Sequence, residues 1–314
     1  MASTPQSFRF GVQTSKGASA REWRELARKV EALGYSTIYT PDHFVDQPLA
    51  PVVALTMAAE ATDQLRVGAL VFDNDYKHPA ILAKEMATLD LLSEGRVEMG
   101  IGAGWMKTDY DALGLPYDPP AVRVDRFEEA LTVIKGCFSS EPFSFSGDHY
   151  TITDYTSRPK PVQQPGPPLL IGAGGKRMLS IAARNADIVG VNPNLRAGEV
   201  GPDAVRDSLA AQTRKKIEWI RAAAGDRFDS IELQYRAFVC AITDDAHGFA
   251  ESMAGAMGIE AQDALDSALM LAGTEAQVEE MILRRREELG FSYLVVGDDS
   301  FEAFAPIVAR LVGT

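Results

Sequence analysis

Cysteine and histidine are both scarce in this chain of 314 residues, which has two of the first and four of the second. Cys137 and Cys240 lie inside apolar patterns, so we expect buried free thiols and no disulfide framework. The histidines do not form a spaced set of metal ligands. The first strand-like run also reads Phe10-Gly11-Val12-Gln13, without the His-x-His of metal-dependent barrel hydrolases. We therefore predict no metal site.

Basic residues and long apolar runs are lacking as well. The chain has 31 Lys and Arg against 44 Asp and Glu, a formal net charge of −13. A surface this acidic disfavours nucleic acid and anionic membranes as partners. No apolar run approaches the roughly 18 residues of a spanning helix, and residues 1–7 lack the pattern of a secretory signal. We expect a cytoplasmic protein that acts on a small molecule.

Three common motif classes are absent. No Ser-centred G-x-S-x-G elbow of a hydrolase occurs. Gly172-Ala173-Gly174-Gly175-Lys176 has neither the ending of a Walker loop nor the G-x-G-x-x-G spacing. Asp73-Asn74-Asp75 lacks the spaced glycine and final glutamate of an EF-hand, so we interpret it as a solvated or substrate-facing turn.

What the chain does have is a regular alternation of short β-rich runs with helical segments. Such alternation is typical of a parallel sheet covered on both faces. Eight runs match a (β/α)₈ TIM barrel, and an open doubly wound sheet is the alternative. The runs are 8–13, 37–40, 65–72, 97–101, 168–171, 187–191, 231–242 and 293–296. The helices span about 19–34, 51–62, 79–93, 123–138, 176–185, 204–224, 274–289 and 301–311.

Two long connections interrupt the alternation. Residues 139–167 contain a hairpin-like stretch at 143–150, and residues 243–273 look helical. Long loops in compact folds are often lids or interfaces. We predict one domain, 1–314, in which both connections are insertions into the barrel.

The carboxyl ends of barrel strands meet at one mouth, where such folds bind their ligands. His43 follows Asp42 at such an end and is a candidate proton donor or cofactor contact, with a loop cap as the alternative. Gly172 to Gly175 open a helix whose amides and dipole would hold a phosphate, with Lys176 or Arg177 adding charge, and a tight turn is the alternative. The other strand-exit residues are Gln13, 69–75, 102–105, Asn192 and Asp298.

Nine segments spread over nearly the whole chain form a recognisable set. They are Phe10-Gly11-Val12-Gln13, Glu31-Ala32-Leu33-Gly34-Tyr35, Pro41-Asp42-His43, His78-Pro79, residues 89–96, residues 100–105, Tyr110-Asp111-Ala112-Leu113-Gly114, residues 123–130 and residues 170–175. Together they resemble the bacterial-luciferase-like superfamily and, within it, the oxidoreductases that use the deazaflavin coenzyme F420.

The resemblance implies a barrel that holds a flavin-like ring at its mouth and transfers a hydride between coenzyme F420 and a small organic substrate. A monooxygenase using flavin mononucleotide (FMN) and a non-catalytic flavin-binding relative are the alternatives. It also implies a homodimer. The apolar residues proposed to face the partner are Val52, Val53, Leu55 and Met57.

The same resemblance implies roles for individual residues. Asp42 and His43 would be the catalytic pair beside the ring, and a bulge at Ala69-Leu70, often with a non-prolyl cis peptide, would back the ring. Trp105 stands where sugar-phosphate-oxidising relatives carry a glutamate, which leaves His43 as the best proton-transfer candidate. The implied cofactor contacts are Gln13, His43, Ala69, Leu70, Gly102, Gly104, Trp105, Gly172, Gly174, Gly175 and Lys176.

Overall fold

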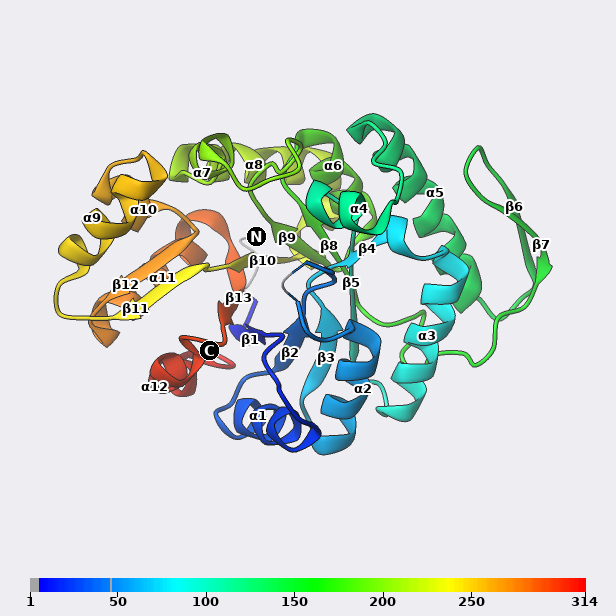
Figure 1. Ribbon diagram of the computed structural model, residues 1–314, viewed down its shortest axis with the longest axis horizontal. Coiled ribbons are helices and arrows are strands. Elements are labelled where there is room, and N and C mark those ends of the chain that lie inside the picture. Colours follow the sequence, from blue (N-terminus) through cyan, green and yellow to red (C-terminus); the bar gives the residue numbers. More distant parts are fainter. Residues whose placement is uncertain (1–5, 46) are drawn as a thin grey trace.

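The computed structural model describes residues 6–45 and 47–314. At its centre is a closed ring of parallel strands with eight strand positions (Figure 1). The strands are β1 (Arg9–Gln13), β2 (Thr37–Thr40), β3 (Arg66–Ala69) continued by β4 (Phe72–Asp73), β5 (Val97–Gly102), β8 (Leu169–Ala173), β9 (Ile188–Val191), β10 (Glu232–Arg236) and β13 (Phe291–Gly297). Their order is β3-β2-β1-β13-β10-β9-β8-β5, and a β3–β5 pairing closes the ring. The predicted (β/α)₈ barrel is confirmed, and the open sheet is excluded.

Helices cover the outside of this ring (Figure 1). Ser19 caps the first by accepting a hydrogen bond from Glu22 N, and Thr274 and Gln277 form a reciprocal capping box. No helix in the described part of the chain is both long and apolar enough to cross a membrane. The covering helices are α1 (Ala20–Ala32), α2 (Pro51–Ala61), α3 (Pro79–Leu92), α5 (Pro120–Phe138), α6 (Lys176–Asn185), α8 (Ala210–Ala224), α11 (Glu275–Leu289) and α12 (Phe301–Leu311).

Some short elements differ from the prediction. The helix expected over 204–224 is two helices, α7 (Pro202–Asp207) and α8, which are separated at Ser208 and Leu209. The helix α4 (Lys107–Leu113) was not predicted and follows directly after the exit of β5. Two 3₁₀ turns complete the set, η1 (Asn74–Tyr76) and η2 (Gly225–Ser230).

The strand predicted over 231–242 is wrong as a single element. Its first half is β10, but the chain turns away at Ala237, and β11 (Val239–Ile242) pairs with β12 (Met270–Gly273) outside the barrel. β-forming residues continue through this turn, so composition alone does not mark it. The predicted helical insertion holds α9 (Ala246–Met257) and α10 (Ala261–Asp266), and β12 was missed. The other insertion carries the expected hairpin, β6 (Phe143–Ser146) and β7 (Thr151–Tyr155), which extends away from the barrel in Figure 1.

Apolar side chains form separate clusters outside and inside the ring. The large outer cluster fills the space between the strands and the helices, with Phe10, Ile38 and Met99 among its members. The inner cluster has Tyr39, Leu170, Ile188, Tyr293 and Val295, against which Leu70 and Val71 pack. Successive strand residues point to opposite faces, so each strand supplies both clusters.

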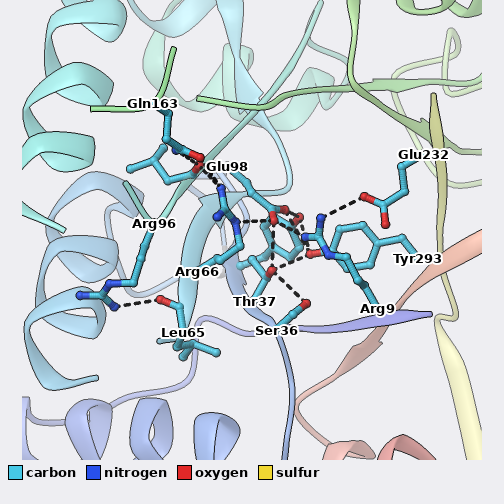
Figure 2. A network of polar contacts seen from close by, with 12 residues as sticks. Arg9, Ser36, Thr37, Leu65, Arg66, Arg96, Glu98, Gln163, Glu232 and Tyr293 are labelled. Atoms are coloured by element: carbon cyan, nitrogen blue, oxygen red, sulfur yellow. Dashed lines mark hydrogen bonds and ion pairs between the residues drawn. The ribbon is translucent and has the colours of Figure 1, made fainter. Parts of the chain in front are cut away.

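A charged network fills the amino-terminal end of the barrel (Figure 2). The fully buried Glu98 carboxylate pairs with Arg9 and with Arg66 Nε at 2.8 Å, and it accepts the Tyr39 hydroxyl at 2.5 Å. Burial alone would raise the pKa of Glu98, but the two guanidinium groups and the Tyr39 hydroxyl hold it below its usual range. Arg9 also reaches Glu232 at 3.0 Å, yet burial raises the pKa of Glu232 to about 7.

Three inward-facing glycines make room for the third strand to bulge into the barrel. A Cβ added at Gly102 would lie 2.9 Å from Val71 Cγ2, and one added at Gly172 would lie 3.3 Å from Val71 Cγ1. At Gly100 the added Cβ would lie 2.0 Å from the carbonyl oxygen of Ala69. Leu70 and Val71 therefore form an apolar shelf inside the ring, above the charged network and below the mouth.

Candidate active site

A histidine–aspartate pair stands at the mouth of the barrel. His43 follows β2, and its Nδ1 lies 2.7 Å from Asp109 Oδ2 on α4. The edge of the imidazole meets the Trp105 ring, with centroids 5.4 Å apart. Asp109 binds the Nδ1 atom of this ring. The other ring nitrogen, Nε2, has no hydrogen-bond partner among the described residues. This arrangement fixes one tautomer and orients the ring.

Asp109 was not among the predicted site residues. Its side chain is fully buried, and its Oδ1 also accepts the backbone N–H groups of Phe44 at 3.0 Å and Val45 at 2.8 Å. Burial opposes ionisation, but these hydrogen bonds and the one to His43 lower the pKa of Asp109. Asp109 is thus a fixed carboxylate that also holds the loop after His43. Its signal in the sequence is weak: one acid in the first turn of a short helix.

A second group of polar side chains, from the segment Asp73-Asn74-Asp75, lies beside this pair. The burial of Asp73 and Asn74 excludes the interpretation of this segment as a solvated turn. Asp73 and Asn74 are buried, and the Asp73 carboxylate accepts the Tyr110 hydroxyl at 3.0 Å. Asp73 N donates to Asp42 Oδ2 at 3.1 Å. Burial raises the pKa of Asp42, and it raises that of Asp73 to about 7. The half-buried Asp42, which precedes His43 in the chain, and the buried Asp73 thus form an acidic pair.

The neighbouring Asp75 is neutralised by an ion pair. Arg126 Nη1 lies 2.8 Å from Asp75 Oδ1 and also binds Asp118. The guanidinium therefore compensates Asp75 and not Asp73. Neither Asp42 nor Asp73 has a salt bridge within the described chain, which agrees with the raised pKa of each.

The residues of the predicted bulge occupy different positions. Ala69 is fully buried, whereas Leu70 and Val71 are half-buried and form the shelf. The non-prolyl cis peptide joins Leu70 to Val71, one residue beyond the predicted place. Gln13 Nε2 donates to the Leu70 carbonyl at 2.6 Å, so Gln13 supports the shelf. Leu70 and Gln13 thus reach the mouth, and Ala69 lies behind it.

The predicted glycines are largely explained by contacts within the chain. Gly102 and Gly172 accommodate Val71, and a Cβ on Gly104 would lie 2.0 Å from the Tyr110 hydroxyl. Gly104 also has a φ of +76°, which favours glycine. A Cβ on Gly174 would lie 2.1 Å from the Pro193 carbonyl oxygen. Gly175 differs, because its nearest neighbour would be 3.6 Å away.

Gly175 is the N-cap of α6, and no side chain caps that helix end. The first-turn amides of α6 are therefore free to hold an anion. The basic residues beside them point elsewhere. Lys176 Nζ lies 6.0 Å from the Trp219 ring centroid, and Arg177 pairs with Asp125 and Glu128. An anion here would be held by backbone amides.

The other exit residues have mixed roles. Asp298 accepts the Thr14 hydroxyl at 2.7 Å and pairs with Lys16 at 2.9 Å, and Asn192 Nδ2 lies 3.4 Å from the Gly190 carbonyl. Arg236 ends β10 at the same mouth and was missed, because it lay inside the run taken as one long strand. Within residues 6–45 and 47–314, no group of three His, Cys, Asp or Glu side chains is arranged to hold a metal.

The mouth offers the kinds of group that a flat ring with a phosphate-bearing tail would need. Leu70 and Val71 form an apolar surface inside the ring of strands, and His43 and Trp105 contact each other at the strand exits. The uncapped start of α6 offers amides for a phosphate. An apolar shelf with a few convergent polar groups is the usual form of a cofactor site.

Comparison with known proteins identifies the family. The sequence profile described as "Luciferase-like monooxygenase" matches residues 4–299. The FMNH(2)-dependent dimethylsulfone monooxygenase of Pseudomonas putida is 28% identical over 241 residues, which are 74% of this chain and 62% of that protein. The F420-dependent glucose-6-phosphate dehydrogenase of Amycolatopsis mediterranei is 30% identical over 174 residues, 53% of this chain and 52% of that one.

The alignments thus span between half and two thirds of these curated relatives. Among solved structures, the coenzyme F420 dependent tetrahydromethanopterin reductase from Methanopyrus kandleri superposes with a TM-score of 0.76. It is 20% identical, and the match covers 98% of this chain and 99% of the other. That likeness concerns the fold, whereas the profile match covers almost the whole sequence. The chain belongs to the luciferase-like monooxygenase family.

Proposed function

We propose that this protein is an oxidoreductase that transfers a hydride between coenzyme F420 and a small organic substrate at the barrel mouth. The observation that carries the proposal is the His43–Asp109 pair beside Trp105, at the end of the barrel where the strands exit. A hydride added to a carbonyl or an activated double bond must be accompanied by one proton. An oriented imidazole at the edge of a ring site is suited to deliver it.

The chain's residues have separable roles in this scheme. When bound, the deazaflavin ring supplies a carbon that gives or takes a hydride. His43 takes up and releases the proton at Nε2, and Asp109 holds the ring by accepting its Nδ1–H. The shelf and Trp105 exclude water from one side, and Gln13 keeps the shelf in place. The amides at the start of α6 bind the phosphate of the tail.

The second candidate is an FMN-dependent monooxygenase. It is supported by the similarity to the dimethylsulfone monooxygenase, a protein that uses FMNH(2). F420-dependent enzymes appear among the relatives as well, so similarity alone does not choose. A protein that binds a flavin without catalysis is the third candidate. All three share the ring site, and they differ in the ring that it accepts and in turnover.

Titration of the protein with two pairs of compounds distinguishes these candidates. Each pair consists of a phosphorylated cofactor and its ring without phosphate: F420 with deazariboflavin, and FMN with riboflavin. We expect the fluorescence of F420 to fall when it binds the protein, and we expect F420 to bind more tightly than FMN. Each parent ring without phosphate, deazariboflavin or riboflavin, should bind more weakly than its phosphorylated partner, because α6 then has no anion. Tight FMN binding with no response to F420 would reverse the assignment. Binding without reduction of any carbonyl or enoate substrate would favour the third candidate.

We further propose that the protein is a homodimer through α2 and α3. An apolar groove of about 390 Å³ lies between these helices, with Val52, Ile81 and Leu92 in its lining. Val53 and Leu92 are exposed over 65% and 70% of their surface, and exposed apolar patches of this kind mark interfaces. Leu55, expected to face the partner, is fully buried within its own chain.

A charge placed on this face should separate the subunits. We expect light scattering to give twice the mass of one chain for the wild type and a single chain for Val53→Glu. Val200→Glu is the matched control, because Val200 is 67% exposed but lies before α7, away from the groove. A monomeric wild type at micromolar concentration, or equal behaviour of the two variants, would contradict the proposed interface.

A further inference from the structure

Strand β10 presents a row of polar side chains to the inside of the barrel. Alternate residues Glu232, Gln234 and Arg236 share one face, and Glu232 defines that face as the inner one by its ion pair with Arg9. Glu232 therefore has its partner. Gln234 Nε2 and Arg236 Nε are buried donors, and neither has a hydrogen-bond partner within residues 6–45 and 47–314.

Arg236 lies at the mouth end of this row and is held in a defined orientation. It is the last residue of β10, and its Nη2 lies 3.7 Å from the position of a Cβ on Gly297, at the end of β13. Its guanidinium carbon lies 4.1 Å from the centroid of the Phe238 ring, which is half exposed. Attraction between the cation and the aromatic face helps to hold the guanidinium at this place.

No carboxylate of the described chain pairs with Arg236, although two acids lie nearby. Asp298 is engaged by Thr14 and Lys16, and Asp299 is an exposed residue. Burial lowers the pKa of Arg236 below its usual range, but an arginine remains charged at neutral pH. A positive charge with a buried, unpaired N–H is costly, because the donor has lost its hydrogen bonds to water without gaining a partner.

We propose that Arg236 and Gln234 form an oxyanion site that binds the carboxylate of a small-molecule substrate. The planar edge of a guanidinium matches the two oxygens of a carboxylate, and the Gln234 amide below it supplies a further donor. The assignment of this oxyanion to a substrate rests on the proposed function. The carboxylate anchors the substrate at β10, and the reacting carbon extends toward the shelf.

The topology separates this site from the phosphate and from His43. The start of α6 follows β8, two strand positions from β10 in the ring. His43 follows β2, and the order β2-β1-β13-β10 places it three positions away in the other direction. A molecule held at Arg236 therefore faces the Leu70–Val71 shelf, which follows β3 four positions away, and His43 follows the strand next to β3. This is the arrangement needed for a substrate whose acid group is distinct from its reacting group.

Binding of simple carboxylates to the cofactor-free protein tests the site. We expect calorimetry to show that benzoate binds the wild type and that benzamide, its neutral counterpart, does not. Arg236→Met should weaken benzoate binding at least about tenfold, because a charge-assisted hydrogen bond is lost. Gln234→Leu should weaken it less. Arg24→Met is the matched control, since Arg24 is exposed on α1 and far from the mouth.

The outcomes separate the site from the proposed function. Equal binding of benzoate and benzamide, or equal benzoate binding by the wild type and R236M, would overturn the oxyanion site. If R236M instead loses F420 or FMN affinity more than tenfold while benzoate has no effect, Arg236 serves the cofactor and the substrate assignment is wrong. Should R236M fail to fold, Arg236→Lys tests the same point, because lysine keeps the charge without the planar fork. Benzoate binding is measured without cofactor, so failure of the F420 assignment alone leaves this result readable.

Discussion

His43→Ala should lower turnover at least about 100-fold while the protein stays folded. A positioned general acid or base contributes about 10²–10⁴-fold to a rate, and His43 is the imidazole that Asp109 orients at the mouth. The rate is measured under anaerobic conditions with the substrate on which the wild type is fastest. Cofactor affinity should change little by comparison, because the phosphate and the shelf are untouched.

Two further variants sharpen this prediction. His78→Ala is the matched control, since His78 caps α3 through its Nδ1 and lies outside the mouth, and it should keep the wild-type rate. Asp109→Asn should lose activity because an amide N–H facing Nδ1 forces the other tautomer on His43. Near-normal turnover of His43→Ala would mean that the histidine only holds its loop. Asp73→Asn would then test the buried acid beside it.

Glu98→Gln should lower the free energy of unfolding by about 3–5 kcal/mol, the largest stability effect expected in this chain. The change leaves Arg9 and Arg66 buried in part against a neutral partner, and breaking a buried ion pair on one side is strongly destabilising. Urea unfolding at neutral pH measures the effect. Glu218→Gln, on the exposed face of α8, is the matched control and should change stability by less than about 0.5 kcal/mol.

The difference in unfolding free energy between the wild type and Glu98→Gln should depend on pH. The pKa of Glu98 is lowered in the folded state from its ordinary value of 4.5, so its contribution is complete above that value. It is lost as the pH falls through the lower folded-state pKa. The stability gap between wild type and Glu98→Gln should therefore narrow as the pH falls below 4.5. A gap that instead widens toward low pH would contradict the charged network.

Much of the barrel was predictable because its signals are local. Short apolar runs, helix caps and glycines after helices can each be recognised within a few residues, as at Ser19 and Gly95. The strand 231–242 failed for the same reason, since β-forming residues continue past Arg236 while the pairing partner changes from β13 to β12. Which strand a segment pairs with is decided by the closed ring as a whole and leaves no signal in the local sequence.

The sequence indicates which residues lie at the strand exits but not what they contact. His43 and Asp42 are candidates because strand exits converge in a barrel. Asp109 and Arg236 were missed, since nothing in the sequence says that the first meets a residue 66 positions earlier. The charged network has the same character. Arg9 and Glu98 are 89 positions apart, and Arg9 and Glu232 are 223 apart. Each is visible only as a charge within a strand.

The packing of Val71 against two glycines constrains the order in which mutations can be accepted. A methyl group at Gly102 or Gly172 meets one of the two Cγ atoms of Val71. Shortening residue 71 to alanine first would relieve both contacts, whereas alanine at Gly102 beside Val71 gives an overpacked intermediate. Gly100 has no such route, since its obstacle is the Ala69 backbone. Substitutions that reshape the mouth floor are therefore coupled across three strands.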